Sequence, residues 1–308
     1  MNVWLNGKIV SEENAQISVF DSSVQHGIGV FETMYARKTE VFRLDNHLEQ
    51  LFFSAKNLKL VETLRLDLIS NAIDELLVHS NYSESRLKLT LTGGVLGYYP
   101  ETNKANNPTI IITCQRSTKY PDDFFQKGVL STISRSRENP HIFTSGHKSI
   151  DYWSRISALQ EASLFSAGES IWLTPEANVA SGSVSNVFCV KGGVVKTPPA
   201  RFNSGFSNDK SPVRPGVTRG CVIDLAKQLG YKVEINEISI DAFLDADESF
   251  LTNSSWGILP VVGLCLGRGA KDETKTGVKK FGSGVPGPVT RELREGWLDC
   301  LDLEIGPL

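Results

Sequence analysis

The fold can be interpreted starting from two segments, His147-Lys148-Ser149-Ile150-Asp151-Tyr152 and Val179-Ala180-Ser181-Gly182-Ser183-Val184-Ser185-Asn186-Val187-Phe188. The first places Lys148 immediately before a stretch with the apolar spacing of an amphipathic helix. A partly desolvated lysine can form an imine with an aldehyde cofactor. Tyr152 and Trp153 follow closely enough to desolvate Lys148 and lower its pKa. The same residues are also compatible with a core-facing helix that begins after a solvated surface lysine.

Two further segments have the character of a phosphate-binding site. Gly216-Val217-Thr218-Arg219 precedes a predicted helix, whose first N–H groups are unpaired and whose dipole favours an anion. Thr252-Asn253-Ser254-Ser255 follows an apolar strand and adds hydroxyl and N–H donors. Each segment alone is equally well explained by an ordinary helix cap or turn. Together with Lys148 they indicate pyridoxal 5'-phosphate (PLP), which is an aldehyde that carries a phosphate.

Composition argues against several other kinds of function. The 308 residues suggest about two domains, and a net charge of −3 provides no basic surface for nucleic acid or an anionic membrane. The N-terminus lacks the regions of a signal peptide, and no apolar run reaches the roughly 18 residues that span a membrane. We therefore expect small molecules or another subunit as partners, no nucleic acid, no membrane, and a cytoplasmic location.

The cysteines are scattered and show no C-x-x-C spacing. They predict buried thiols rather than a disulfide framework or a zinc site, so we expect no bound metal. The five positions are Cys114, Cys189, Cys221, Cys265 and Cys300.

The apolar pattern predicts a small domain at 1–114, a polar linker at 115–127 and a large domain at 128–308. In the small domain we expect strands at 3–10, 17–20, 27–36, 85–92 and 109–113, and helices from Asp45 and near 67–79. In the large domain we expect strands at 128–134, 169–173, 231–237 and 248–252, a hairpin at 186–196, helices at 151–167, 215–230 and 289–301, and a mobile loop at 267–287.

Short motifs follow one another in a fixed order along nearly the whole chain. They are Asn6-Gly7, Ile17-Ser18-Val19-Phe20-Asp21, Gly29-Val30-Phe31-Glu32-Thr33, Phe42-Arg43-Leu44-Asp45-Asn46-His47-Leu48, Lys148, Ser185-Asn186-Val187-Phe188, Gly216-Val217-Thr218-Arg219 and Gly287-Pro288-Val289-Thr290. This set resembles the class IV aminotransferase family, which has PLP fold type IV. The family includes branched-chain aminotransferases, D-amino acid transaminases and aminodeoxychorismate lyases.

The resemblance implies an α/β (α+β) fold with a small α/β domain and a larger domain that contains a β-barrel-like sheet. It implies PLP in the cleft between the domains and a homodimer. It further implies transfer of an amino group between an amino acid and a 2-oxo acid. Lys148 would form the internal aldimine with PLP and move the proton between the substrate α-carbon and the cofactor.

The resemblance also assigns cofactor contacts to individual positions. The phosphate would be held through backbone N–H groups or hydroxyls, and Asn186 would lie beside the pyridine ring. The expected cofactor-binding residues are Ser181, Ser185, Asn186, Gly216, Val217, Thr218, Ser254, Ser255 and Gln50. The substrate candidates, chosen by location only, are His26, Tyr35, Arg37 and Arg135.

Two positions depart from the family pattern. Ser181 stands where the family has a glutamate that binds the protonated pyridine nitrogen, and a serine supplies no charge. Gln50 stands where the family has a phosphate-binding arginine, so a charge-assisted contact worth about 1.5–3 kcal/mol is lost.

These departures leave three hypotheses: an aminotransferase, a lyase of the aminodeoxychorismate type that releases pyruvate from an amino-chorismate-like substrate, and a homologue that has lost PLP catalysis. A requirement for a 2-oxo acid separates the first two. The motifs fix neither the substrate nor its chirality.

Overall fold

The computed structural model describes residues 2–95, 107–201, 211–269 and 272–308, and the chain divides into two compact units. The first unit comprises Met1–Thr118, His147–Asp151 and Leu301–Leu308, and the second comprises Lys119–Gly146 and Tyr152–Cys300. The change of unit between residues 118 and 119 falls inside the expected linker, 115–127. The limits of the functional domains stay a prediction.

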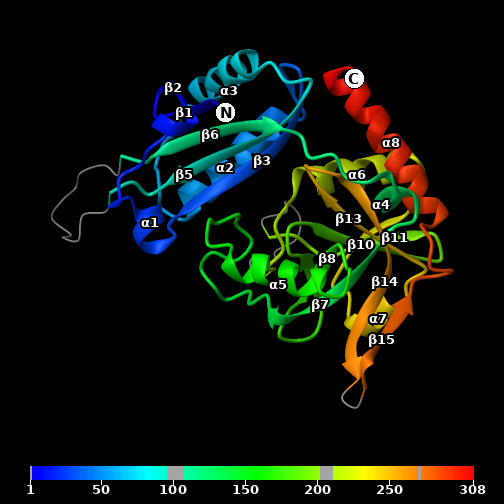
Figure 1. The fold of residues 1–308 in the computed structure, drawn as a ribbon. Helices are drawn as coiled ribbons and strands as arrows, with labels where there is room; N and C mark the ends of the chain where they lie inside the picture. Colours follow the sequence, from blue (N-terminus) through cyan, green and yellow to red (C-terminus); the bar gives the residue numbers. More distant parts are fainter. Residues whose placement is uncertain (1, 96–106, 202–210, 270–271) are drawn as a thin grey trace. The chain divides into compact units, whose positions relative to one another are not determined.

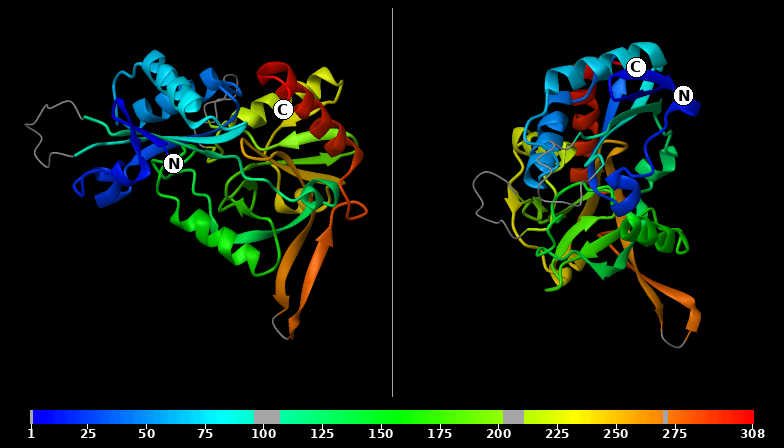
Figure 2. Two further views of the ribbon diagram at one scale, coloured as in Figure 1. Left: turned by 45° about the horizontal axis from the view of Figure 1, so that its top comes forward. Right: turned by 90° about the vertical axis from the view of Figure 1, so that its left-hand side faces the viewer.

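The first unit contains a six-stranded antiparallel sheet with the order β2-β1-β6-β5-β3-β4. Its strands are β1 (Asn2–Leu5), β2 (Lys8–Ser11), β3 (Gly29–Arg37), β4 (Glu40–Val41), β5 (Glu84–Thr92) and β6 (Ile110–Arg116). Helices α2 (Leu44–Asn57) and α3 (Leu66–Ser80) pack on one face of this sheet (Figures 1 and 2).

The alternation along β5 explains this packing. Leu87, Leu89 and Leu91 are fully buried in the core formed with α2 and α3. Lys88 and Thr90 lie on the opposite face, because successive side chains of a strand point to opposite sides. The face without α2 and α3 therefore carries polar side chains.

Two expectations for the N-terminal region are wrong. The strand expected at 3–10 is a hairpin of β1 and β2, since Asn6 and Gly7 take positive φ angles and reverse the chain. The segment 17–20 forms no strand, and Val19 and Phe20 are exposed. It ends at Asp21, which caps helix α1 (Ser22–His26).

The second unit is built around strands that close into a barrel-like ring. Among the described residues the ring runs β10-β13-β14-β7-β8-β9 and returns to β10 through the pair Asn186–Ser181. Its strands are β7 (Val129–Arg137), β8 (Glu169–Leu173), β9 (Val179–Gly182), β10 (Asn186–Lys191), β13 (Glu248–Asn253) and β14 (Gly257–Gly269). Strands β11 (Val194–Thr197), β12 (Val233–Ile235) and β15 (Asp272–Lys280) extend the sheet outside the ring.

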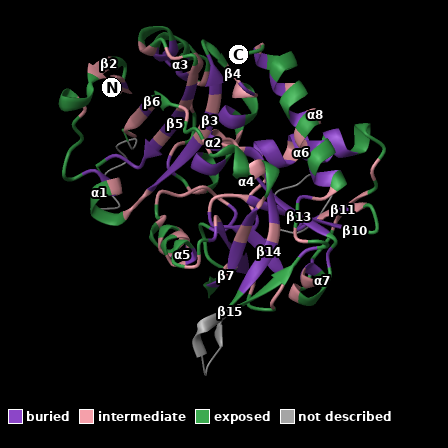
Figure 3. Ribbon diagram, turned by 45° about the vertical axis from the view of Figure 1, so that its right-hand side comes forward, coloured by how far each residue is buried: buried purple, intermediate pink, exposed green. Residues whose placement is uncertain are grey.

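Apolar side chains fill one side of the ring, among them Ile171, Val187 and Leu251. Figure 3 shows β14 as a largely buried strand. The other helices of the second unit are α4 (Asp122–Gln126), α5 (Trp153–Ser163), α6 (Val217–Gln228) and α7 (Ile240–Leu244), and the first unit also contains the short helix η1 (Glu12–Asn14). Helix α8 (Pro288–Ile305) starts in the second unit, and its residues from Leu301 belong to the first.

Two expectations for this part of the chain need correction. The expected mobile loop at 267–287 contains β15, whose backbone pairs with β14, although residues 270–271 lie outside the described residues. The helix expected at 151–167 spans only Trp153–Ser163. In the described part of the chain, no helix is long and apolar enough to cross a membrane.

Asp21 gives a test of how the first unit is held together. Its carboxylate accepts hydrogen bonds from the Ser23 N–H (2.8 Å), Ser23 Oγ (2.7 Å), Thr92 Oγ1 (2.9 Å) and Thr109 Oγ1 (2.7 Å). Burial raises the pKa of Asp21, but these hydrogen bonds outweigh it and the pKa is lowered.

We expect Asp21→Asn to lower the free energy of unfolding by about 1–3 kcal/mol at neutral pH. Because the folded-state pKa lies below the unfolded one, the wild-type advantage is present above the ordinary aspartate pKa and is lost as the pH falls through the folded-state pKa. Urea unfolding of both proteins from pH 7 to pH 3 measures the difference. A difference that stays constant or grows toward acid pH would contradict this account.

Candidate functional site

Lys148 lies on a short extended segment that continues the sheet of the first unit. The Phe31 N–H donates to the Lys148 carbonyl (2.9 Å), and the Ile150 N–H donates to the Gly29 carbonyl (3.0 Å). Ser149 forms a bridge with Val30 between these two bonds. A Cβ at Gly29 would lie 2.8 Å from the Leu91 carbonyl oxygen and 3.0 Å from Cδ1 of Ile150, so the segment can approach only a glycine.

The Lys148 ammonium lies over an aromatic ring that a second lysine also contacts. Its Nζ is 4.4 Å from the centroid of the Phe31 ring, and the Nζ of Lys88 is 4.6 Å from the same centroid. Phe31 and Lys88 share a sheet face, because Lys88 pairs with Thr33, two residues along β3 from Phe31. This is the face opposite α2 and α3.

Lys88 was missed in the sequence analysis as a functional residue. The available signal was the alternation in β5, which sets Lys88 on the polar side opposite Leu87 and Leu89. The pattern shows the face but not which element lies over it. Only the pairing of residues 147–151 with β3 brings Lys88 and Lys148 to one ring.

The substrate candidates of the first unit have structural contacts. Arg37 is buried, forms a salt bridge with Asp302 and donates to the Gly306 carbonyl (2.6 Å). Tyr35 donates to Glu84, and burial raises the pKa of Tyr35 to about 12. His26 is exposed at the end of α1.

The other candidate residues have different surroundings in their own units. Gln50 is half-buried in α2, and Nδ1 of His147, in the same unit, lies 3.0 Å from Ser54 Oγ. In the second unit the Arg135 side chain is 87% exposed, 3.6 Å from Glu161. The assignment of His26, Tyr35, Arg37, Arg135 and Gln50 to substrate or cofactor stays a prediction.

In the second unit, two expected cofactor residues and a threonine from the expected phosphate-binding segment 252–255 stand in one row across the ring. Ser181 pairs with Asn186, and Asn186 pairs with Thr252 on β13. Direct cross-strand partners present their side chains on the same face. Adjacent strands lie about 4.8 Å apart, so the row spans roughly 10 Å.

The N-terminus of α6 lies against the middle of this row. The Asn186 Nδ2 donates to the Arg214 carbonyl (2.9 Å), and a Cβ at Gly216 would collide with Asn186 Oδ1. Gly216 caps α6 without a side-chain hydrogen bond, which leaves the first N–H groups of the helix available. On the strand next to Asn186, Thr252 Oγ1 is buried and has no hydrogen-bond partner among the described residues.

We call the N–H groups of Val217 and Thr218 together with Thr252 Oγ1 the anion cup. A buried hydroxyl without a partner beside a helix N-terminus provides donors that a phosphate would satisfy. Arg219, in the same motif, is buried and donates to the Pro198 carbonyl (2.8 Å), which fastens α6 to the strand side. Burial lowers the pKa of Arg219 to about 10, which leaves it charged at neutral pH.

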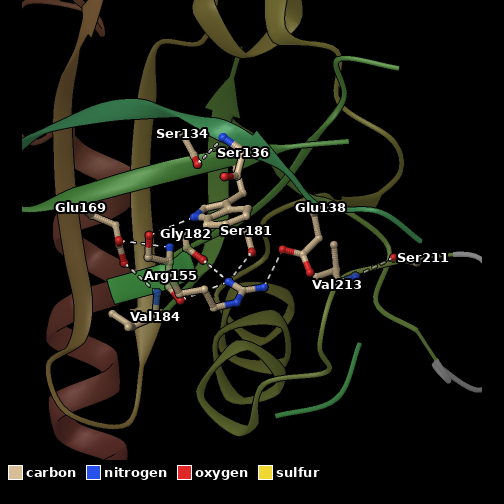
Figure 4. A network of polar contacts seen from close by, with 12 residues as sticks. Ser134, Ser136, Glu138, Arg155, Glu169, Ser181, Gly182, Val184, Ser211 and Val213 are labelled. Atoms are coloured by element: carbon tan, nitrogen blue, oxygen red, sulfur yellow. Dashed lines mark hydrogen bonds and ion pairs between the residues drawn. The ribbon is translucent and has the colours of Figure 1, made fainter. Parts of the chain in front are cut away.

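A buried carboxylate fixes the turn between β9 and β10 (Figure 4). Glu169 accepts hydrogen bonds from the N–H groups of Ser170 (2.9 Å), Ser183 (3.1 Å) and Val184 (3.2 Å), and from Ser185 Oγ (2.9 Å). Burial raises the pKa of Glu169, and these hydrogen bonds, which act in the opposite direction, offset only part of that rise. Glu169 thus holds the turn that presents Ser185 and Asn186. The sequence analysis missed this residue, and the available signal was an acidic residue at the start of an apolar strand.

The turn that contains Ser254 and Ser255 is hydrogen-bonded to the turn between β9 and β10. Asn253 Oδ1 accepts from the Ser255 N–H (2.9 Å), and Asn253 Nδ2 donates to the Val184 carbonyl (3.2 Å). Ser254 and Ser255 are half-buried in this turn. The second unit therefore brings together Ser181, Ser185, Asn186, Gly216, Val217, Thr218, Ser254 and Ser255 as neighbouring parts of one structure.

Comparison with known proteins assigns the family. The sequence profile described as "Amino-transferase class IV" matches residues 29–264. The chain belongs to the class IV aminotransferase family. As a member, it is an enzyme of the aminotransferase type, and PLP is its cofactor.

Three relatives illustrate the range of the family. A Methanocaldococcus jannaschii protein, provisionally named a branched-chain-amino-acid aminotransferase, is 31% identical over 262 residues, which cover 85% of this chain and 87% of the relative. The aminodeoxychorismate lyase of Bacillus subtilis is 29% identical, with 84% and 85% of the two chains covered. The solved T.th. branched-chain amino acid aminotransferase with pyridoxamine 5'-phosphate is 26% identical, with a TM-score of 0.84 over 97% and 93% of the chains.

These likenesses confirm the expected α/β fold of PLP fold type IV. Residues of each unit, taken separately, also fit a part of the cofactor. The anion cup suits its phosphate, and Lys148 supplies an amine for its aldehyde. Within the part of the chain that the structure describes, no group of three or more metal-ligating side chains occurs.

We expect Thr252→Val to weaken PLP binding roughly 10-fold or more, because the phosphate loses a charge-assisted hydrogen bond. The stability of the cofactor-free protein should stay equal or rise slightly, since a buried unpaired hydroxyl is removed. Fluorescence titration with PLP and urea unfolding measure the two effects.

Ser249→Ala is the matched control. Ser249 lies on the same strand, but its Oγ donates to the Phe188 carbonyl (3.0 Å), so the change should cost stability and spare PLP affinity. Equal PLP affinity in Thr252→Val and wild type would refute the anion cup.

Proposed function

We propose that this enzyme transfers an amino group between an amino acid and a 2-oxo acid, with Lys148 as the residue that holds PLP. The observation that carries the proposal is that backbone hydrogen bonds hold the Lys148 segment against β3, while the second unit of the same chain contains the anion cup. PLP, when bound, draws electrons away from the α-carbon of an amino acid, which makes the α-proton removable.

The residues of the chain then have separate tasks. The anion cup binds the phosphate, and Asn186, fixed by the Arg214 carbonyl, stands beside the ring. Lys148 Nζ accepts the α-proton and returns it, which an amine can do once it is uncharged. Phe31 lies under that amine and limits its access to water.

Lys88 supports recognition of the substrate carboxylate. Its ammonium shares the Phe31 ring with Lys148, on the same face of the sheet. An ammonium that contacts the same aromatic ring as the reacting amine is suited to bind the carboxylate that every amino acid and 2-oxo acid carries. The relatives named as branched-chain aminotransferases make branched-chain amino acids the first donors to assay.

A lyase reaction is the second candidate, because the identity to a relative named aminodeoxychorismate lyase, 29%, lies between the identities to two relatives named as branched-chain aminotransferases, 31% and 27%. We expect turnover of an amino donor to require a 2-oxo acid and to yield one new amino acid per donor consumed. Pyruvate released from an amino-chorismate-like substrate without a 2-oxo acid would instead establish the lyase.

Chromatographic analysis of both substrates and products measures this balance, with Lys148→Ala as the reference for lost catalysis. The variant should fall at least about 1,000-fold in kcat, since both covalent attachment and proton transfer are removed. Turnover by Lys148→Ala at the wild-type rate would remove Lys148 from the proposal.

We expect Lys88→Met to raise the KM for both amino acid and 2-oxo acid about 10-fold or more, because a charge-assisted contact is lost. PLP binding should not change, which separates a substrate role from a cofactor role. Lys8→Met, at an exposed lysine of β2 in the same unit, is the matched control. An unchanged KM in Lys88→Met would exclude the carboxylate contact.

The proposal includes a homodimer in the cytoplasm. Exposed apolar side chains gather around α1 in the first unit, notably Val19 (65%), Phe20 (69%) and Val24 (54%), and burial of such groups favours association with a second copy. The five cysteines are free thiols, as expected for a protein in a reducing compartment.

A further inference from the structure

The guanidinium of Arg155, a residue of α5, lies beside Ser181 (Figure 4). Its Nη1 donates to Ser181 Oγ (3.4 Å) and to the carbonyl oxygens of Gly182 (3.1 Å) and Ser183 (3.1 Å). Ser181 stands at the end of the Ser181–Asn186–Thr252 row, and Thr252 of the anion cup stands at the other end. A fixed positive charge therefore occupies the end of the row away from the phosphate donors.

Three side chains hold Arg155 in this position. Its Nη2 donates to Glu138 Oε2 (2.6 Å), and its guanidinium carbon lies 5.1 Å from the Trp172 ring centroid and 5.8 Å from that of Tyr152. Trp172 is the direct cross-strand partner of Ser181, so the stacked guanidinium cannot leave without opening this contact. Glu138 binds Nη2, whereas Nη1 faces Ser181, so the carboxylate is the more distant charge from the serine.

This arrangement restricts what Ser181 can offer a bound molecule. A hydroxyl has one hydrogen to donate, and its oxygen accepts from others. Arg155 donates to one of the two lone pairs of this oxygen, and its positive charge disfavours a second, cationic donor there, so Ser181 is set to donate its own hydrogen. A neighbouring group in the row must then be an acceptor, and a positive charge beside it disfavours protonation of that acceptor.

We infer that Arg155, acting through Ser181, makes the enzyme bind PLP with its ring nitrogen unprotonated, as the acceptor of the Ser181 hydroxyl hydrogen. The inference rests on the proposed function, because it assigns the ring nitrogen to the Ser181 end of the row and the phosphate to the Thr252 end. Arg155 is a positioning residue, since Ser181 makes the contact. The consequence is a weaker electron sink than a pyridinium ring, so removal of the substrate α-proton depends more on Lys148.

The test uses the complete protein loaded with PLP that carries ¹⁵N at the ring nitrogen. Binding is established first by the absorbance of the complex, and the ¹⁵N NMR signal is then compared with free labelled PLP at acid and alkaline pH. The wild type should give the signal of the unprotonated nitrogen at neutral pH. Ser181→Glu should move the signal to the protonated position, because a carboxylate stabilises the pyridinium proton.

Arg155→Met tests the part played by the guanidinium. It keeps an unbranched side chain on Trp172 but removes the charge, and the signal should move toward the protonated position. Arg291→Met, at an exposed arginine of α8 in the second unit, should leave the signal at the wild-type position. Circular dichroism and the absorbance of bound PLP verify that each variant is folded and loaded.

The outcomes separate the two levels of the argument. A protonated nitrogen in the wild type overturns the inference while the proposed function stands. An unprotonated nitrogen in Arg155→Met, equal to that of the wild type, overturns the role of Arg155. Failure of the wild type to bind PLP overturns the proposed function and this inference with it.

Discussion

The second unit depends on one cross-strand pair, Ser181 with Asn186, which closes the ring of strands. Without it, β9 would end the sheet as an open edge, and the turn between β9 and β10 would lose one of its attachments. Glu169 reinforces the closure by accepting four hydrogen bonds from the turn and its surroundings. The row that closes the barrel is also the row that leads to the anion cup, so stability and binding share the same residues.

The first unit applies a comparable constraint to Lys148. Its segment is held by backbone hydrogen bonds to β3, and the Lys148 side chain contacts the Phe31 ring, which Lys88 also contacts. Backbone pairing fixes the position of the lysine independently of its ammonium, so chemistry at the amine need not disturb the fold. Both halves of the functional apparatus are therefore built on sheet backbone rather than on flexible loops, as a precise site requires.

Periodicity was enough to predict most elements. Local patterns predicted a strand from the leucines of β5, a helix from the apolar spacing of α2, and a hairpin at Gly192-Gly193. The structure confirms all three. Sequence patterns failed where tertiary contacts decide. Ile17 to Phe20 alternate like a strand but find no partner strand, and the glycine-rich stretch after Gly267 pairs with β14 although its composition is typical of a loop.

The site divides in the same way. Motif order selected Lys148, Asn186 and the start of α6 as candidates, because each lies in or between the motifs that resemble the family. Lys88, Glu169 and Arg155 have no motif, and their roles depend on which strands and helices meet. Ser181 was noticed as a departure, but only the structure shows the guanidinium that accompanies it.

The central claim is that Lys148 holds PLP, and borohydride reduction tests it most directly. The purified protein is saturated with PLP, its absorbance is recorded, the complex is reduced, and the modified peptide is identified by mass spectrometry. We expect an absorbance band of the bound cofactor and a single stable pyridoxyl group on Lys148. A pyridoxyl group on Lys88, its neighbour at the Phe31 ring, or no modified lysine at all, would contradict the account.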